Sequence, residues 1–136
     1  MRTLWLLLLL VPVSLTGQYR LEVEAQGVRS SEGLVQVALY REESSFLKFD
    51  RVFRNANAPA EEGVTKVVFT DLPAGQYAIA IFHDENANDE LDTNWLGIPR
   101  EPLGFSRARM KTFGPPSFRD CVINLQEDVT IEIPLE

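Results

Sequence analysis

The sequence predicts an all-β fold, an antiparallel Greek-key β-sandwich of about seven strands with at most one short helix. Short segments alternate apolar and polar side chains with a period of two, which is typical of strands with one buried face. Clusters of Gly, Pro, Asn, Asp and Ser separate these segments, as turns between strands do. Long stretches with the 3.6-residue periodicity of helices are missing from the sequence.

Residues 1–17 have the composition of a secretory signal peptide. Arg2 precedes an apolar run from Leu4 to Val13, and small residues follow up to Gly17. The run is too short to span a bilayer comfortably, and no later segment predicts a transmembrane helix. We therefore expect a protein that is secreted or periplasmic, with cleavage near Gly17 and a single β-sandwich domain over residues 18–136.

The chain is acidic. Without Arg2, 12 basic and 20 acidic side chains remain, a net charge of −8, which disfavours nucleic acid and anionic membranes as partners. The single cysteine, Cys121, excludes an internal disulfide, so the domain depends on its hydrophobic core. We expect Cys121 to be a small buried apolar side chain.

Five segments have the alternation of strands. They are residues 19–25, 33–41, 64–70, 76–83 and 129–135. The first two are separated by a Ser- and Gly-containing turn, which favours a hairpin or near-hairpin between them. The segment 76–83 is apolar on both faces, so we expect a central strand covered on both sides.

Other segments are less regular. Ser44 or Ser45 is a candidate cap for a short helix, and residues 55–62 are predicted as a loop. The expected helix would carry on one side the apolar residues Phe46, Phe49, Val52 and Phe53. Residues 106–111 are predicted as a short strand or edge segment, and residues 121–125 as a short strand.

An acidic stretch follows the central strand and contains five carboxylates and three Asn side chains between positions 83 and 94. Its spacing matches positions 1, 3, 5, 7 and 9 of an EF-hand calcium loop, with a backbone carbonyl as the ligand at position 7. The residues at these positions are Asp84, Asn86, Asn88, Glu90 and Asp92. Hard cations prefer such oxygen ligands, so the stretch predicts a structural calcium site.

The match to an EF-hand is incomplete. Asp89 occupies position 6, where Gly normally allows a sharp turn, and Trp95 occupies position 12, where a bidentate Glu is usual. A strand, rather than a helix, precedes the loop. The alternative is a solvated acidic loop, in which Asn and Asp are present because they suit turns.

Two other functional classes compete with a cation-binding domain. Four aromatic residues in irregular segments, Trp95, Phe105, Phe113 and Phe118, would either contact an envelope protein or glycan or cap the core. His83 beside Asp84 is the candidate for a hydrolase-type or metal site in an enzyme. A lone His and the absence of nucleophile, phosphate and dinucleotide motifs favour a protein that is not an enzyme.

The run Asp71-Leu72-Pro73-Ala74-Gly75-Gln76-Tyr77 resembles the turn and strand of transthyretin-like and carboxypeptidase-regulatory-like sandwich domains. Residues 72–120 resemble a bacterial exported family called domain of unknown function 2141. The similar pieces are 73–78, Phe82-His83-Asp84-Glu85-Asn86-Ala87-Asn88, Asp92, 97–99, Glu101, 104–106 and 116–120. The resemblance implies an exported β-sandwich and no particular activity. The chain departs from the family at Asp89, where Gly is usual, and at Arg107-Ala108, where Asn is usual.

Overall fold

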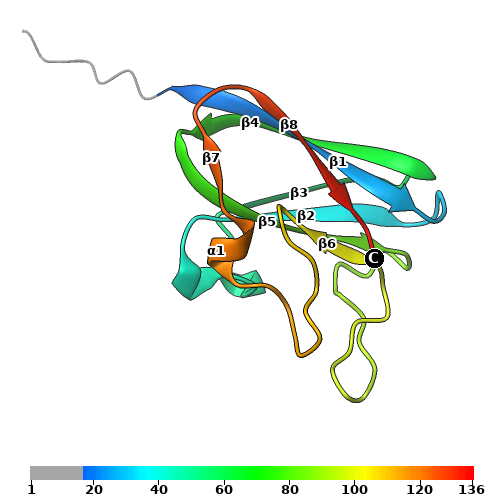
Figure 1. The fold of residues 1–136 in the computed structure, drawn as a ribbon. Coiled ribbons are helices and arrows are strands. Elements are labelled where there is room, and N and C mark those ends of the chain that lie inside the picture. The colour runs from blue at the N-terminus through cyan, green and yellow to red at the C-terminus, as the bar shows by residue number, and fades with distance from the viewer. Residues whose placement is uncertain (1–16) are drawn as a thin grey trace, which may run out of the picture.

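Strand β1 (Gln18–Val28) is the centre of the first sheet. The structure is a computed structural model that describes residues 17–136, so the predicted signal peptide, except Gly17, lies outside the described residues. Strand β4 (Gly63–Pro73) pairs with β1 antiparallel, and β8 (Val129–Pro134) pairs with it in parallel. The order of this three-stranded sheet is β4-β1-β8 (Figure 1).

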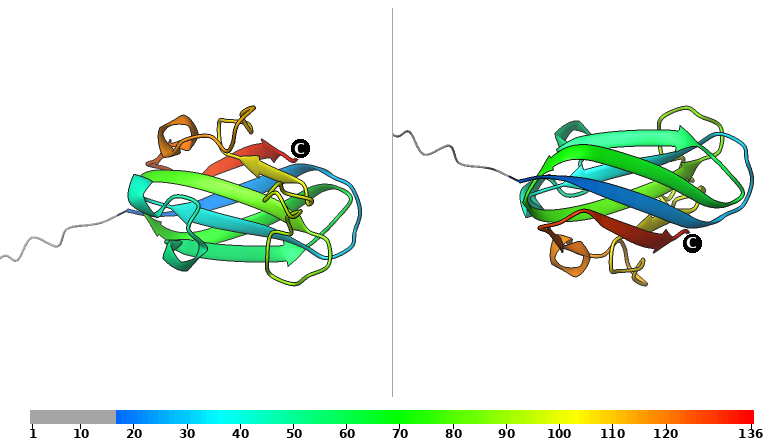
Figure 2. Two further views of the ribbon diagram at one scale, coloured as in Figure 1. Left: turned by 90° about the horizontal axis from the view of Figure 1, so that it is seen from below. Right: turned by 90° about the horizontal axis from the view of Figure 1, so that it is seen from above.

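The second sheet has five strands, and all its pairings are antiparallel. Its main order is β3 (Arg54–Pro59), β2 (Leu34–Tyr40), β5 (Gly75–Asp84) and β6 (Leu103–Phe105). A short strand, β7 (Ile123–Leu125), pairs with the beginning of β5. Figure 2 shows the two sheets stacked as layers, with the first sheet facing the viewer in the right-hand view. The all-β sandwich is therefore confirmed.

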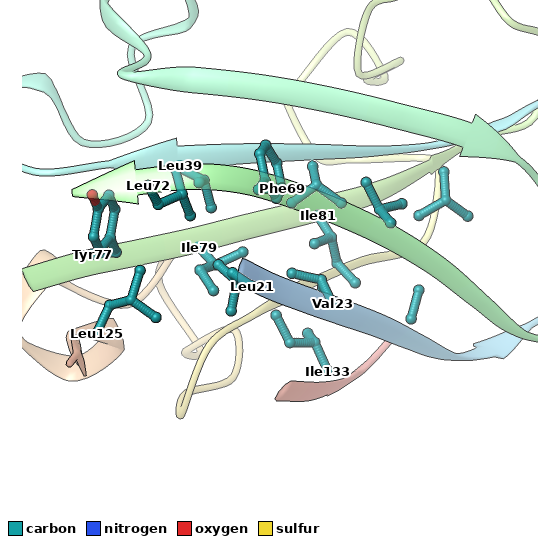
Figure 3. Close-up of a cluster of buried hydrophobic side chains, with 14 of the residues drawn as sticks. Leu21, Val23, Leu39, Phe69, Leu72, Tyr77, Ile79, Ile81, Leu125 and Ile133 are labelled. Carbon is teal, nitrogen blue, oxygen red and sulfur yellow. The ribbon is translucent and has the colours of Figure 1, made fainter. Parts of the chain in front are cut away.

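The main core lies between the two sheets (Figure 3). Alternate residues of β1, β2, β4 and β5 point into this space and are almost completely buried, as the period-two patterns predict. They include Leu21, Val23, Val35, Val37, Leu39, Val67, Phe69, Tyr77, Ile79 and Ile81. Leu125 and Ile133 complete this core from β7 and β8.

Strand β5 is buried on both faces, as expected from its sequence. Tyr77 and Ile79 belong to the main core, whereas Ala78 and Phe82 belong to a second cluster on the outer face of the second sheet. That cluster includes Tyr40 and is covered by the four-residue helix α1 (Phe118–Cys121). Such burial makes β5 a rigid base for the loop that follows it.

Two predictions about strand pairing were wrong. The segments predicted to form a hairpin, 19–25 and 33–41, are β1 and β2, and they belong to different sheets. The turn between them crosses from one layer to the other instead of closing a hairpin. The sheets are also not antiparallel throughout, because β8 runs parallel to β1.

The predictions for residues 42–62 were also wrong in part. Two 3₁₀ turns, Glu43–Ser45 and Phe49–Arg51, replace the expected helix. The expected loop 55–62 contains strand β3, whose Ala56 and Ala58 pack against the main core. The sequence did not predict this strand because it contains Asn and Pro, which are uncommon in strand interiors.

Helix α1 replaces the beginning of the strand predicted at 121–125, which is reduced to β7. Ser117 caps α1 by accepting a hydrogen bond from the Asp120 N–H, and the Asp120 side chain accepts one from the Ser117 N–H. Cys121 is buried, as predicted, and burial raises the pKa of its thiol to about 11, with a smaller contribution from the Asp120 charge.

Long connections occupy the remaining segments. The predicted strand at 106–111 is absent, since only isolated bridges occur there and β6 precedes it. Residues 85–102 connect β5 to β6, and residues 106–117 connect β6 to α1. Within residues 17–136, the helices are all shorter and less apolar than a membrane crossing requires.

Candidate metal centre

The acidic loop begins at the buried end of β5. His83 and Asp84 have no exposed surface, and both pair across to β2. Gly33, in the turn before β2, has a left-handed backbone (φ 71°) and lies directly against the carbonyl of Asp84, so that a Cβ atom at position 33 would overlap it. Close packing of these two segments fixes the direction in which the loop leaves the sheet.

The carboxylate of Asp84 organises the loop. Its Oδ1 accepts a hydrogen bond from the Asn88 N–H at 3.1 Å, and its Oδ2 accepts one from the Asp89 N–H at 2.8 Å. The Nε2 of Gln36, on β2, donates to the same Oδ2 at 3.1 Å. A carboxylate can accept about four hydrogen bonds, so Asp84 retains about one acceptor position.

Two residues of the loop have left-handed backbone conformations, Ala87 with φ 53° and Asp89 with φ 62°. The resemblance noted in the sequence implies Gly at position 89, and Gly adopts this conformation without steric cost. Asp tolerates the left-handed region better than most residues do. The Asp89 side chain also accepts a hydrogen bond from Gln36 Nε2 at 2.9 Å, so the sharp turn is present despite the substitution.

The side chains of Asn86, Asn88 and Asp92 converge on one another. Asn86 Nδ2 donates to Asp92 Oδ2 at 2.6 Å, and Asn88 Nδ2 donates to Asp92 Oδ1 at 3.0 Å. Asn86 Oδ1 accepts from the Asn88 N–H at 3.3 Å, and Asn88 Oδ1 accepts from the Glu90 N–H at 3.0 Å. The structure thus brings Asp84, Asn86, Asn88 and Asp92 together, whereas Glu90 participates through its N–H.

Glu101 is a residue of the site that the spacing argument missed. It is buried, and its carboxylate accepts the Glu85 N–H and the Asp92 N–H, both at 3.0 Å. These two bonds tie the beginning and the end of the acidic loop to the segment before β6. The sequence indicates this role only weakly, in that Glu101 is the single acidic residue between positions 93 and 119.

An open pocket of about 400 Å³ adjoins the loop. It is lined by Glu85, Asn86, Asp92, Thr93, Arg100 and Glu101. In the described part of the chain, His, Cys, Asp and Glu side chains nowhere gather in threes in an arrangement that would hold a metal ion. A cation in the loop would therefore depend on the amide oxygens of Asn86 and Asn88 in addition to carboxylates.

His83 points away from solvent. Its Nε2–H donates to the Glu32 carbonyl at 2.7 Å, and its Nδ1 lies 4.0 Å from Glu85 Oε1. No described residue forms a hydrogen bond with Nδ1. A substrate in solvent has no access to this imidazole in the conformation shown, and the ring ties the end of β5 to the β1–β2 turn.

The four aromatic residues separate into two pairs. Phe105 and Phe118 are buried in the outer cluster, as residues that cap the core would be. Trp95 and Phe113 are 89% and 101% exposed, at the tips of the two long loops. These two alone remain available for contact with a partner.

Comparison with known proteins gives one family. Residues 23–132 match the family described as "uncharacterized protein conserved in bacteria (DUF2141)". Searches of curated proteins and of solved structures found no match. The match covers all of the acidic loop and most of both sheets, and it agrees with the similarity noted at residues 72–120. This chain belongs to the DUF2141 family of bacterial proteins.

Proposed function

We propose that this protein is an exported, non-enzymatic β-sandwich domain whose 84–92 loop binds a structural calcium ion. The observation that carries the proposal is the convergence of Asn86, Asn88 and Asp92 above the buried Asp84 carboxylate. Residues at positions 1, 3, 5 and 9 of a calcium loop are expected to meet in this way.

The remaining acceptor positions support the same proposal. Each oxygen of Asp92 accepts one side-chain hydrogen bond, and so retains a free lone pair. The Oδ1 atoms of Asn86 and Asn88 also accept one backbone bond each, which leaves one lone pair on each. Together with Asp84, the loop has enough hard oxygen ligands to replace several waters around Ca²⁺.

Charge repulsion within the loop gives the ion a role. Five carboxylates, those of Asp84, Glu85, Asp89, Glu90 and Asp92, lie within nine residues, and a divalent cation would relieve their mutual repulsion. We expect the ion to order residues 85–102 with the modest affinity of extracellular calcium modules. Export of the domain is the expectation from residues 1–17.

A thermal melt of residues 18–136, which contain both sheets and the whole core, tests the calcium site. At a calcium concentration about 100 times Kd, preferential binding to the folded state adds about 2.7 kcal/mol to the free energy of unfolding. For a domain of this length, that corresponds to a rise in Tm of about 10 °C. The melt is measured in EDTA, in calcium and in magnesium at one ionic strength.

Two variants make the test specific. Asp92→Asn removes a ligand charge from the loop and should abolish the calcium-dependent rise. Asp50→Asn, at an exposed position in the 3₁₀ turn Phe49–Arg51, removes the same charge elsewhere and should keep the rise. A Tm that is the same in EDTA and in calcium would contradict the proposal. The loop would then be a solvated acidic loop held by its own hydrogen bonds.

Trp95 and Phe113 favour a second role for the domain, contact with a component of the cell envelope. Both aromatic rings project into solvent, and neither is needed for the core. Trp95 belongs to a run of exposed apolar side chains with Leu96 and Ile98, and clustered exposed apolar side chains are typical of interaction sites.

A further inference from the structure

A buried segment lies between the acidic loop and the end of β8. Residues 101–105 are all buried, whereas none of residues 85–100 is. We call residues 101–105 the buried segment. It begins at Glu101 and includes the whole of β6, and Figure 1 shows the C-terminal end of the described chain beside β6. The two ends of this segment are bonded to different parts of the domain.

At its first end, the buried segment holds the acidic loop by the backbone. The Glu101 carboxylate is 7% exposed and accepts the N–H groups of Glu85 and Asp92, both at 3.0 Å. The neighbouring Arg100 N–H donates to the Asp92 carbonyl at 2.8 Å. Both backbone polar groups of Asp92 are therefore bonded to residues 100 and 101, so that this end of the loop moves with the buried segment.

At its other end, the buried segment holds Glu136, which follows β8. The Leu103 N–H donates to the Glu136 carbonyl at 3.1 Å, and the Glu136 N–H donates back to the Leu103 carbonyl at 2.9 Å. The preceding residue, Leu135, donates its N–H to the Gln26 carbonyl of β1 at 2.9 Å. Consecutive residues thus bond to opposite sheets, and they join the two sheets along this side of the sandwich.

Gly104 allows β6 and β8 to approach closely. A Cβ atom at position 104 would overlap the Pro134 carbonyl oxygen and crowd the Ile133 side chain. Closely packed segments transmit a shift from one to the other. A displacement of the buried segment therefore displaces the end of β8 as well.

Residues 135 and 136 have the properties of an element with an open and a closed state. Glu136 is exposed and Leu135 is only partly buried, so that backbone hydrogen bonds hold them more than apolar burial does. Segments with few buried apolar contacts open locally, at a lower cost in free energy than unfolding of the whole domain.

We propose that the buried segment couples the acidic loop to the end of β8, so that an ordered loop keeps Leu135 and Glu136 bonded to the two sheets. Calcium bound in the loop strengthens this closure. Such coupling is reciprocal, so the closed end of β8 raises the affinity for calcium by the same factor. The effect of calcium rests on the proposed function, whereas the coupling in the metal-free domain does not.

Amide hydrogen exchange of residues 18–136 in EDTA tests the coupling without calcium. Glu101→Gln replaces one acceptor oxygen with an NH₂ group, so one of the two loop N–H groups loses its partner. Exchange should accelerate at Glu85 or Asp92. It should also accelerate about fivefold at Leu135, whose N–H is bonded to β1 and not to the buried segment.

Two variants perturb the opposite end. Gly104→Ala crowds the Pro134 carbonyl and should accelerate exchange at Leu135 and, through the buried segment, at Asp92. Leu135→Ala is a milder change, which removes apolar contacts from the end of β8 and should have the same effects to a smaller extent. The control is Ala56→Gly, which weakens β3 at the opposite edge of the second sheet and should leave exchange at both positions unchanged.

Calcium provides a second measurement. Isothermal titration calorimetry of the unmodified domain gives Kd for calcium. Saturating calcium should then slow exchange at Leu135 and Glu136 about fivefold, and by more than it slows exchange at Ala56. Gly104→Ala changes none of the calcium ligands and should raise Kd by up to the same factor.

Three results would overturn the proposal. The first is unchanged exchange at Leu135 in Glu101→Gln together with unchanged exchange at Asp92 in Gly104→Ala and Leu135→Ala. The second is an equal acceleration at these positions in Ala56→Gly, which would indicate a general loosening of the domain. The third is calcium binding that leaves exchange at Leu135 and Glu136 unaltered. An absence of calcium binding in calorimetry would instead refute the proposed calcium site, and the measurements in EDTA would still decide whether the loop and β8 are coupled.

Discussion

Replacing Asp84 with Asn should destabilise the domain even without calcium. The Asp84 carboxylate is completely buried and accepts three hydrogen bonds, two from the backbone N–H groups of Asn88 and Asp89 and one from Gln36. An Asn side chain has one acceptor oxygen and presents an NH₂ group in place of the other. One donor of the loop would therefore face another donor.

The cost follows from the bonds that are lost. A hydrogen bond to a charged acceptor contributes about 1.5–3 kcal/mol, and a buried N–H left without a partner costs about 1–3 kcal/mol. Removal of one negative charge relieves part of the repulsion with Glu85, Asp89 and Glu90, which offsets some of the loss. We expect the free energy of unfolding to fall by about 2–4 kcal/mol for Asp84→Asn.

Urea denaturation of residues 18–136 in EDTA measures this difference directly, with the slope of the transition as a check on two-state behaviour. Asp50→Asn, at an exposed position, is the control and should change the free energy of unfolding by less than about 0.5 kcal/mol. A change as small as this for Asp84→Asn would refute the claim that its carboxylate holds the loop. Amide exchange at Asn88 and Asp89 should also accelerate in the variant.

Gly33→Ala should lower the free energy of unfolding by at least about 2 kcal/mol in urea denaturation. The new Cβ would overlap the Asp84 carbonyl, and position 33 has a positive φ. An unaltered urea midpoint would show that the turn moves freely. A hydrogen bond from Lys111, followed by those from Ser117, lowers the pKa of Asp120 to about 2. Because the folded-state pKa lies below the ordinary 3.8, the contribution of Asp120 to stability is complete above that value and is lost as pH falls towards 2. A carboxylate titration by NMR should show the pKa of Asp120 rising in Lys111→Ala, and an unmoved titration would exclude this ion pair as the cause.

Period-two alternation predicted the strands whose burial also alternates. Strands β1, β2, β4, β5 and β8 lie within a few residues of the predicted bounds, because each buries one set of alternate side chains in the main core. Pairing was less predictable. A Ser- and Gly-rich turn is compatible with a hairpin and also with a crossing between the two sheets. Which of the two forms depends on the sheet in which each strand finds its hydrogen-bonded neighbours.

Period-two alternation did not predict the short elements β3 and α1. Strand β3 alternates Asn with Ala, and Ala gives a weak apolar signal although Ala56 and Ala58 pack against the core. Helix α1 is a single turn fixed by the capping box of Ser117 and Asp120, which is a local signal that can be read from sequence. It ends at Cys121, the first residue of the apolar run Cys121-Val122-Ile123, which favoured a strand from Cys121 onward.

The acidic loop was partly predictable. Spacing alone indicated that Asp84, Asn86, Asn88 and Asp92 would approach one another, and their hydrogen bonds bring them together. Whether they bind calcium stays a prediction. The contribution of Gln36 comes from a segment 48 residues away from Asp84, so only the folded chain reveals it. Glu101 lies nearer in sequence but outside the spacing of the calcium loop, so the spacing argument did not include it.

Strand β8 comes late in the chain and pairs with β1, the first strand that the structure describes. The first sheet therefore closes only when nearly the whole chain is available, and contacts between such distant residues slow folding. Until β8 docks, the backbone of residues 21–26 is an open sheet edge in the centre of the future sheet. Open edges of this kind pair readily with other chains. The domain is thus most prone to aggregation in the interval before its last strand arrives.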